Sequence, residues 1–122
     1  MRLNKVQKTA VTALEDIKAR DITVLDVRKL TSLYSTLVIA SAESNRQVRA
    51  LASHVRDKLK EAGAPILGVE GEDSGEWVLV DAGDIVVHIM QPAVRAYYNL
   101  EELWGPGSAT RTRKRSAERA AA

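Results

Sequence analysis

This chain contains no cysteine, so histidines and carboxylates are the side chains best suited to chemistry. Disulfides, thiolate nucleophiles and cysteine-ligated metals are therefore excluded. The two histidines, His54 and His88, lie far apart in the sequence. His88 stands within the apolar stretch Ile85–Met90, where a lone histidine without a nearby nucleophile motif is typical of a hydrogen-bonded structural residue. We predict no catalytic residue, no metal ligand and no cofactor.

The carboxylates do not form the pattern that phosphoryl transfer needs. A two-metal site requires acidic side chains on one strand face, converging on Mg²⁺. The apolar stretch Leu37–Ala40 contains none, and Asp26 stands alone in its own apolar stretch. A nucleotidyltransferase-like enzyme is the main alternative to a protein that is not an enzyme, and these residues argue against it. The spaced acidic pairs fall in loops or turns: Glu70 with Glu72, and Asp81 with Asp84.

Length and charge predict one folded domain followed by a basic tail. The 122 residues, 45% of them hydrophobic, suffice for one domain with its own core. Five of the 18 Lys and Arg residues and one of the 16 acidic residues lie in residues 106–122, which therefore carry +4, whereas residues 1–105 carry −2. We expect a domain over residues 1–105, a disordered tail over 106–122, and a cytoplasmic protein without a membrane segment.

Periodicity predicts an α+β fold in which helices pack on a mixed sheet of about five strands. Apolar spacings of three and four indicate a helix over residues 3–19 and another after Ser44, which forms a capping-box signature with Gln47. Gly63 is expected to end this second helix. The unbroken apolar run Leu37–Ala40 is typical of a central strand covered on both faces.

The second half of the domain is expected to contain a hairpin and a short helix. Trp77–Val80 and Ile85–Met90 flank a turn-forming segment, which indicates two antiparallel strands. Pro92 cannot extend the pairing and favours a helix start. Residues 22–27 are rich in β-branched side chains and indicate a further strand.

Several motifs of the chain resemble those of the RsfS/Iojap ribosomal silencing factors. The resemblance runs through Glu76–Asp81 and Gly83–Met90 and extends from about Leu3 to Trp104. It implies a fold similar to nucleotidyltransferases but without catalysis. It further implies a protein that binds the large ribosomal subunit through large-subunit ribosomal protein fourteen, blocks joining of the small subunit and represses translation under nutrient limitation, as in stationary phase.

Aromatic residues are the first candidates for contact with such a partner. Trp77 is equally compatible with an interface anchor and with a core residue, since tryptophan is found both at protein interfaces and in protein cores. His88 is expected to contact the partner rather than to act in catalysis. Tyr97 and Tyr98 are adjacent, so on a helix they point about 100° apart and one is expected to be exposed.

Charged residues complete the candidate site. Asp81 and Asp84 flank a predicted turn. Aspartates in such positions usually stabilise the turn by accepting hydrogen bonds from nearby backbone amides. Outward-facing carboxylates would instead attract a basic ribosomal protein, and Glu101 and Glu102 could extend that patch. Arg95 could pair within it or reach the partner, and the sequence does not decide between these.

Two further alternatives stay open. The arginine-rich residues 111–119 could bind rRNA phosphates, which would suit an RNA-binding module, or could be a solvated tail. An exposed edge strand, such as Trp77–Val80 or residues 22–27, could instead pair symmetrically and give a homodimer.

Overall fold

Six strands form one mixed sheet in the computed structural model, which describes residues 3–103 and 109–111. Their order is β3-β4-β5-β2-β1-β6, and β2 and β5 run parallel whereas the other neighbouring strands pair antiparallel. The predicted α+β class with a mixed sheet is confirmed, and the likeness to nucleotidyltransferases stays a prediction. The strands are β1 (Arg20–Asp26), β2 (Thr36–Ser41), β3 (Gly68–Glu70), β4 (Trp77–Asp81), β5 (Ile85–Met90) and β6 (Ala109–Arg111); the helices are α1 (Lys5–Asp16), α2 (Asn45–Glu61), α3 (Pro92–Tyr98) and α4 (Leu100–Leu103).

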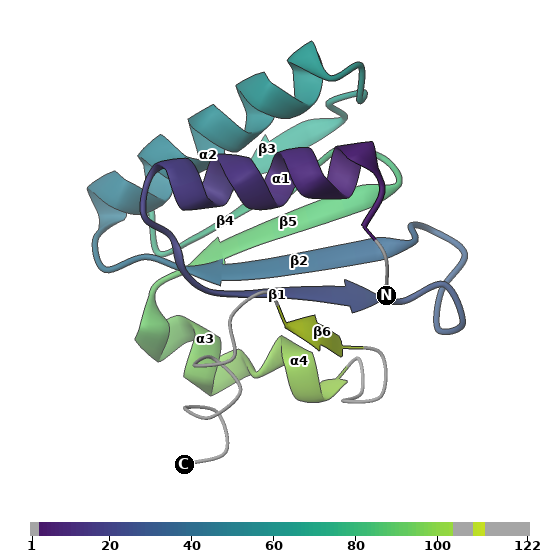
Figure 1. The fold of residues 1–122 in the computed structure, drawn as a ribbon. Coiled ribbons are helices and arrows are strands. Elements are labelled where there is room, and N and C mark those ends of the chain that lie inside the picture. Colours follow the sequence, from purple (N-terminus) through teal and green to yellow (C-terminus); the bar gives the residue numbers. More distant parts are fainter. Residues whose placement is uncertain (1–2, 104–108, 112–122) are drawn as a thin grey trace.

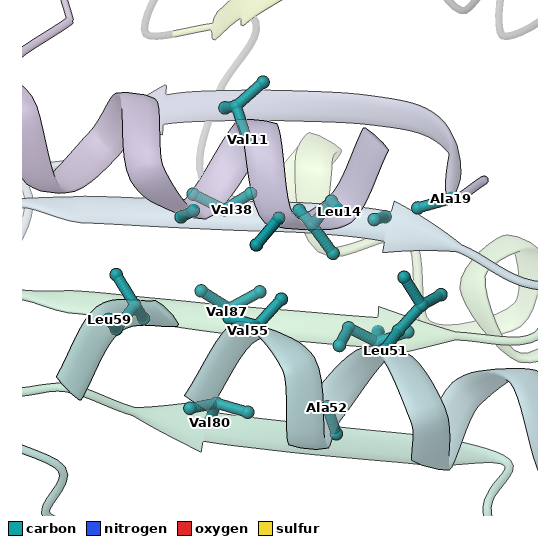
Figure 2. Close-up of a cluster of buried hydrophobic side chains, with 14 of the residues drawn as sticks. Val11, Leu14, Ala19, Val38, Leu51, Ala52, Val55, Leu59, Val80 and Val87 are labelled. Carbon is teal, nitrogen blue, oxygen red and sulfur yellow. The ribbon is translucent and has the colours of Figure 1, made fainter. Parts of the chain in front are cut away.

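Helices α1 and α2 cover one face of the sheet, called the helix-covered face below (Figure 1). Figure 2 shows Leu14 of α1 and Leu51 and Val55 of α2 pointing towards the valines of the strands. These side chains are fully buried, and burying a Leu or Val contributes roughly 1.5–3 kcal/mol. The apolar stripes of the two helices therefore supply the larger part of the core.

Side-chain caps start both of these helices. Asn4 and Gln7 form a complete capping box at α1, with each side chain bonded to the other's backbone N–H at 2.8 Å. At α2, the Ser44 hydroxyl accepts from the backbone N–H of Gln47 at 3.1 Å, as predicted. The Gln47 side chain instead accepts from the backbone N–H of Glu43 at 3.0 Å, so only half of the predicted box is present.

The opposite face of the sheet, called the second face below, is only partly covered. Its buried row includes Leu25, Leu37, Ile39, Val86 and Met90, against which α3 and α4 place Val94 and Leu100. β2 is consequently buried along its whole length, which confirms the predicted central strand. Helices α3 and α4 are short, and Trp77 and Leu79 of β4 remain partly exposed on this face.

Two strand predictions need correction. Neither of the two proposed edge strands lies at an edge: β4 lies between β3 and β5, and β1 lies between β2 and β6. β3 and β6 have three residues each, too few for a periodic pattern in the sequence. β6 falls in the segment predicted to be a disordered tail, whereas Trp104 and residues 112–122 lie outside the described residues. Within the described part, no helix is both long and apolar enough to cross a membrane.

Candidate functional site

Trp77 begins β4 and lies on the second face, opposite Met90 of β5. Its indole Nε1–H donates a hydrogen bond to Nδ1 of His88 at 2.9 Å. The side chain is partly exposed, so it is both a packing residue and part of the surface. Gly71, with φ of +91°, lies so close that an added Cβ would stand 2.0 Å from the Trp77 carbonyl oxygen. The loop before β4 therefore requires glycine here in order to hold Trp77 in place.

His88 is buried beneath this indole, with 8% of its surface exposed. Burial lowers the pKa of His88 from 6.5 to about 4, because the charged imidazolium would lose its hydration. The ring is thus neutral at pH 7. Since Nδ1 accepts a hydrogen bond from the indole N–H of Trp77, Nε2 carries the ring proton of the neutral imidazole. His88 thus makes the hydrogen bond that a structural role requires, and its contact with a partner stays a prediction.

Tyr98 packs against Trp77 and is more exposed than it. Its ring centroid lies 4.8 Å from that of Trp77, and Tyr97 meets Tyr98 edge-on at 5.0 Å. Tyr97 is 82% exposed and Tyr98 is 54% exposed. The predicted exposure of one tyrosine is confirmed, and the other is exposed as well, because the seven-residue α3 has no buried residue and the tyrosines lie at its end. Together these four residues form what we call the aromatic cluster: Trp77, His88, Tyr97 and Tyr98.

A further apolar residue and two carboxylates border the cluster. Leu79 pairs with His88 across the β4–β5 ladder and with Glu70 across the β3–β4 ladder, so the three share the second face. Asp81 follows two residues after Leu79 and therefore shares that face as well. Leu79 and Glu70 were missed by the sequence reasoning, although the period of two from Trp77 would have found Leu79.

The two aspartates of the β4–β5 turn have separate partners. Asp81 Oδ1 accepts from the backbone N–H of Gly83 at 3.0 Å, which is the expected turn role. Asp84 Oδ2 accepts from the hydroxyl of Ser35 at 2.7 Å. Asp81 therefore borders the second face, whereas Asp84 ties the turn to the segment before β2.

Arg95 and Glu101 lie at the other end of β5 and form an internal link. Arg95 Nε donates to Glu101 at 2.9 Å, and the two side chains are 11% and 18% exposed. Its guanidinium also donates to Ser41, to Thr23 and to the carbonyl oxygen of Asp21. These bonds fasten α3 and α4 to β1 and β2. Of the two roles considered for Arg95, the structure shows the one in which it pairs within the domain.

The structure does not bring the predicted acidic patch together. Asp81 and Asp84 lie where β5 begins, whereas Glu101 and Glu102 lie near its end. Glu102 is exposed and accepts from the Asn99 side chain at 2.6 Å. Among residues 3–103 and 109–111, no three His, Asp or Glu side chains are grouped as metal ligands would be. The arrangement is an aromatic surface with Glu70 and Asp81 at its border.

A family model described as "Ribosomal silencing factor during starvation" matches residues 1–122. Among the relatives, the ribosomal silencing factor RsfS of Chromobacterium violaceum is 60% identical over 105 residues, which are 86% of each chain. RsfS of Bacillus subtilis is 39% identical over 105 residues, covering 86% of this chain and 89% of that protein. The chloroplastic protein Iojap of Zea mays is 41% identical over 93 residues, which cover 76% of this chain and 40% of Iojap.

Solved structures agree with these sequence matches. A crystal structure of a Chromobacterium violaceum protein that is 60% identical superposes with a TM-score of 0.82, covering 86% of this chain and 88% of that one. A Bacillus halodurans protein that is 37% identical gives a TM-score of 0.72, covering 80% and 90% of the two chains. Sequence and fold lead to the same assignment, and the chain belongs to the RsfS family of ribosomal silencing factors.

Proposed function

We propose that this protein binds the large ribosomal subunit through large-subunit ribosomal protein fourteen and sterically blocks joining of the small subunit. Membership of a silencing-factor family supports a ribosomal partner. The more detailed mechanism follows from the resemblance to RsfS/Iojap proteins and requires no reaction. A folded domain seated on the face that the small subunit must reach occupies its space, which lowers translation when nutrients are scarce.

The observation that carries this proposal is the exposed aromatic cluster on the second face. Tyr97 and Tyr98 expose most of their surface, and Tyr98 packs on the partly exposed Trp77. Tyr and Trp are enriched among the residues that dominate binding energy at protein interfaces. Because His88 fixes the indole through a hydrogen bond, Trp77 is held in place before the partner arrives. The cluster therefore has the composition and rigidity of an interface anchor.

Charge supports a basic protein as the partner. Glu70 and Asp81 border the aromatic cluster on the second face. Helices α1 and α2 hold seven basic and four acidic side chains, so the rest of residues 1–105 carries a net charge of −5. Complementary charge increases the association rate and the specificity of binding to a basic ribosomal protein.

A sedimentation assay tests this proposal directly. The protein is mixed with isolated large subunits and pelleted, small subunits are then added, and joined ribosomes are counted on a gradient. Wild-type protein is expected to pellet with large subunits and to reduce joining. A Tyr97→Ala, Tyr98→Ala double variant is expected to lose both effects, since these side chains are exposed and their removal leaves the core intact.

The matched control removes two exposed side chains from the helix layer, with no net change of charge: Glu15→Ala with Lys60→Ala. This control is expected to behave as wild type. If wild-type protein stays in the supernatant at micromolar concentration, the proposal fails. If the protein pellets and the two variants are equally active, the second face is not the binding surface.

A further inference from the structure

The helix layer carries charge of the opposite sign to the rest of the domain. With seven basic and four acidic side chains, α1 and α2 have a net charge of +3 against −5 for the rest of residues 1–105. Both helices cover one face of the sheet (Figure 1). The aromatic cluster lies on the second face, where Trp77 packs and Tyr98 contacts it. The two helices are therefore net basic, whereas the remainder of the domain is net acidic.

The basic charge borders a groove between the two helices. The groove has a volume of about 540 Å³, and α1 contributes Lys5, Lys8 and Thr12 while α2 contributes Lys58. Lys5, Lys8 and Thr12 are exposed and lie three and four residues apart, so they share one side of α1. The carboxylate at the far end, Asp16, is paired with His54, with 2.9 Å between Asp16 Oδ2 and His54 Nε2. Three ammonium groups therefore face one engaged carboxylate.

Helix stability does not explain these lysines. Lys5 and Lys8 lie in the first turns of α1, where the helix dipole disfavours cations, and no acidic residue lies in the first turn. Within the described part of the chain, neither lysine has a carboxylate within 4.0 Å, whereas Lys58 approaches Glu61 at 3.8 Å. The ammonium groups of Lys5 and Lys8 are thus available to an external anion.

We propose that this α1–α2 groove binds the phosphate backbone of RNA. The exposed large hydrophobic residues of the described chain all lie outside α1 and α2, so this surface has nothing to insert into a membrane. It also offers no exposed aromatic ring for stacking on bases. Lysine ammonium and threonine hydroxyl groups suit phosphate oxygens, which are contacted without regard to base sequence. The chain belongs to a family of ribosomal silencing factors, and ribosomes contain RNA.

The second face and this groove would then engage different components of the ribosome. The inference does not depend on the proposed contact with ribosomal protein fourteen, because the groove can be tested with RNA alone. A groove variant should bind isolated ribosomal protein fourteen as wild type does. The Tyr97→Ala, Tyr98→Ala variant should bind RNA as wild type does.

Fluorescence anisotropy of a labelled RNA hairpin, measured with the full chain at several salt concentrations, tests the proposal. Three variants each remove three positive charges. The groove variant should bind at least about tenfold more weakly at 0.1 M salt and lower the slope of log K against log salt by about 2 to 3. The loop and tail variants should retain most of this slope. The groove variant is Lys5→Ala, Lys8→Ala, Lys58→Ala. The loop variant, named for the loop after β1 and including the first residue of that strand, is Arg20→Ala, Arg28→Ala, Lys29→Ala. The tail variant is Arg113→Ala, Lys114→Ala, Arg115→Ala.

Circular dichroism and thermal unfolding establish that each variant is folded. Affinity and slope of the groove variant that match those of the loop variant would overturn the proposal, as would a loss confined to the tail variant. Vesicles containing anionic lipid are measured in parallel. Groove-dependent binding to these vesicles without groove-dependent binding to RNA would also overturn it.

Discussion

Trp77 donates its indole N–H to Nδ1 of His88 at 2.9 Å, and this bond joins the surface of the second face to its interior. His88 is buried and neutral, whereas Trp77 is partly exposed and contacts Tyr98. A buried acceptor that was left without its donor would cost about 1–3 kcal/mol. The bond therefore fixes the indole in one orientation beneath the exposed tyrosines.

The first prediction concerns stability in mild acid. His88 has a pKa of about 4 in the folded protein and of 6.5 in the unfolded chain, because burial disfavours its charged form. Between these values the unfolded chain binds more protons, so the free energy of unfolding should fall as the pH falls from about 6.5 to about 4. The loss should reach roughly 3 kcal/mol at pH 4, measured by urea unfolding.

A His88→Gln variant isolates this effect. The glutamine carbonyl can still accept from Trp77 but does not titrate, so the slope between pH 6.5 and 4 should be largely lost. His54→Gln, at the other histidine of the chain, serves as control and should keep the slope. An unchanged slope in His88→Gln would mean that another group causes the pH dependence.

The second prediction separates binding from folding at Tyr98. Because Tyr98 is 54% exposed, Tyr98→Ala should change the free energy of unfolding by less than about 1 kcal/mol. As an interface anchor it should lower the affinity for large subunits by roughly tenfold to thirtyfold. Tyr98→Phe keeps the ring contact with Trp77 and should retain most of the binding. Equal affinities of all three proteins would remove Tyr98 from the interface.

Local sequence patterns were enough to predict much of the fold. The apolar run Leu37–Ala40 gave the central strand, and Ser44 gave the start of α2, because each pattern acts within a few residues. The β4–β5 hairpin was equally predictable, since turn residues separate its two strands. The three-residue strand β6 was not predictable, because pairing with a longer neighbour rather than its own composition makes it a strand.

The candidate site was predictable in part for a similar reason. Trp77 and His88 belong to adjacent strands, so the hairpin register can place them together. Arg95 reaches Thr23, which lies 72 residues away, and nothing in the sequence links these positions. Glu70 joins the second face only through the β3–β4 pairing. Contacts made across the fold therefore decided which of the predicted residues meet.

The third prediction uses charge at the border of the aromatic cluster. Glu70→Lys should weaken binding to the basic ribosomal protein mainly through a slower association rate, and the difference should shrink at high salt. Glu61→Lys makes the same change of charge at the end of α2 and should have a smaller effect. Stopped-flow or surface-based kinetics at two salt concentrations measures this. Equal effects of the two variants would indicate a response to net charge alone.

The fourth prediction concerns the attachment of α3 and α4. Arg95 has 11% of its side chain exposed and bonds Glu101, Ser41, Thr23 and the Asp21 carbonyl oxygen. Arg95→Ala should lower the free energy of unfolding by about 3 kcal/mol, because it leaves a partly buried carboxylate without its cation. Arg95→Lys should recover only part of this loss, since an ammonium group cannot reproduce the planar fork of the guanidinium.

The same variant shows how the attachment serves the surface. Tyr97 and Tyr98 end the helix that Arg95 fastens, so Arg95→Ala should also weaken binding to the large subunit, although Arg95 itself is hardly exposed. Glu102→Ala removes an exposed carboxylate from α4 and should change neither stability nor binding appreciably. Binding is measured under conditions in which the variant is fully folded by circular dichroism. Full binding by folded Arg95→Ala would show that the tyrosines hold their positions without this link.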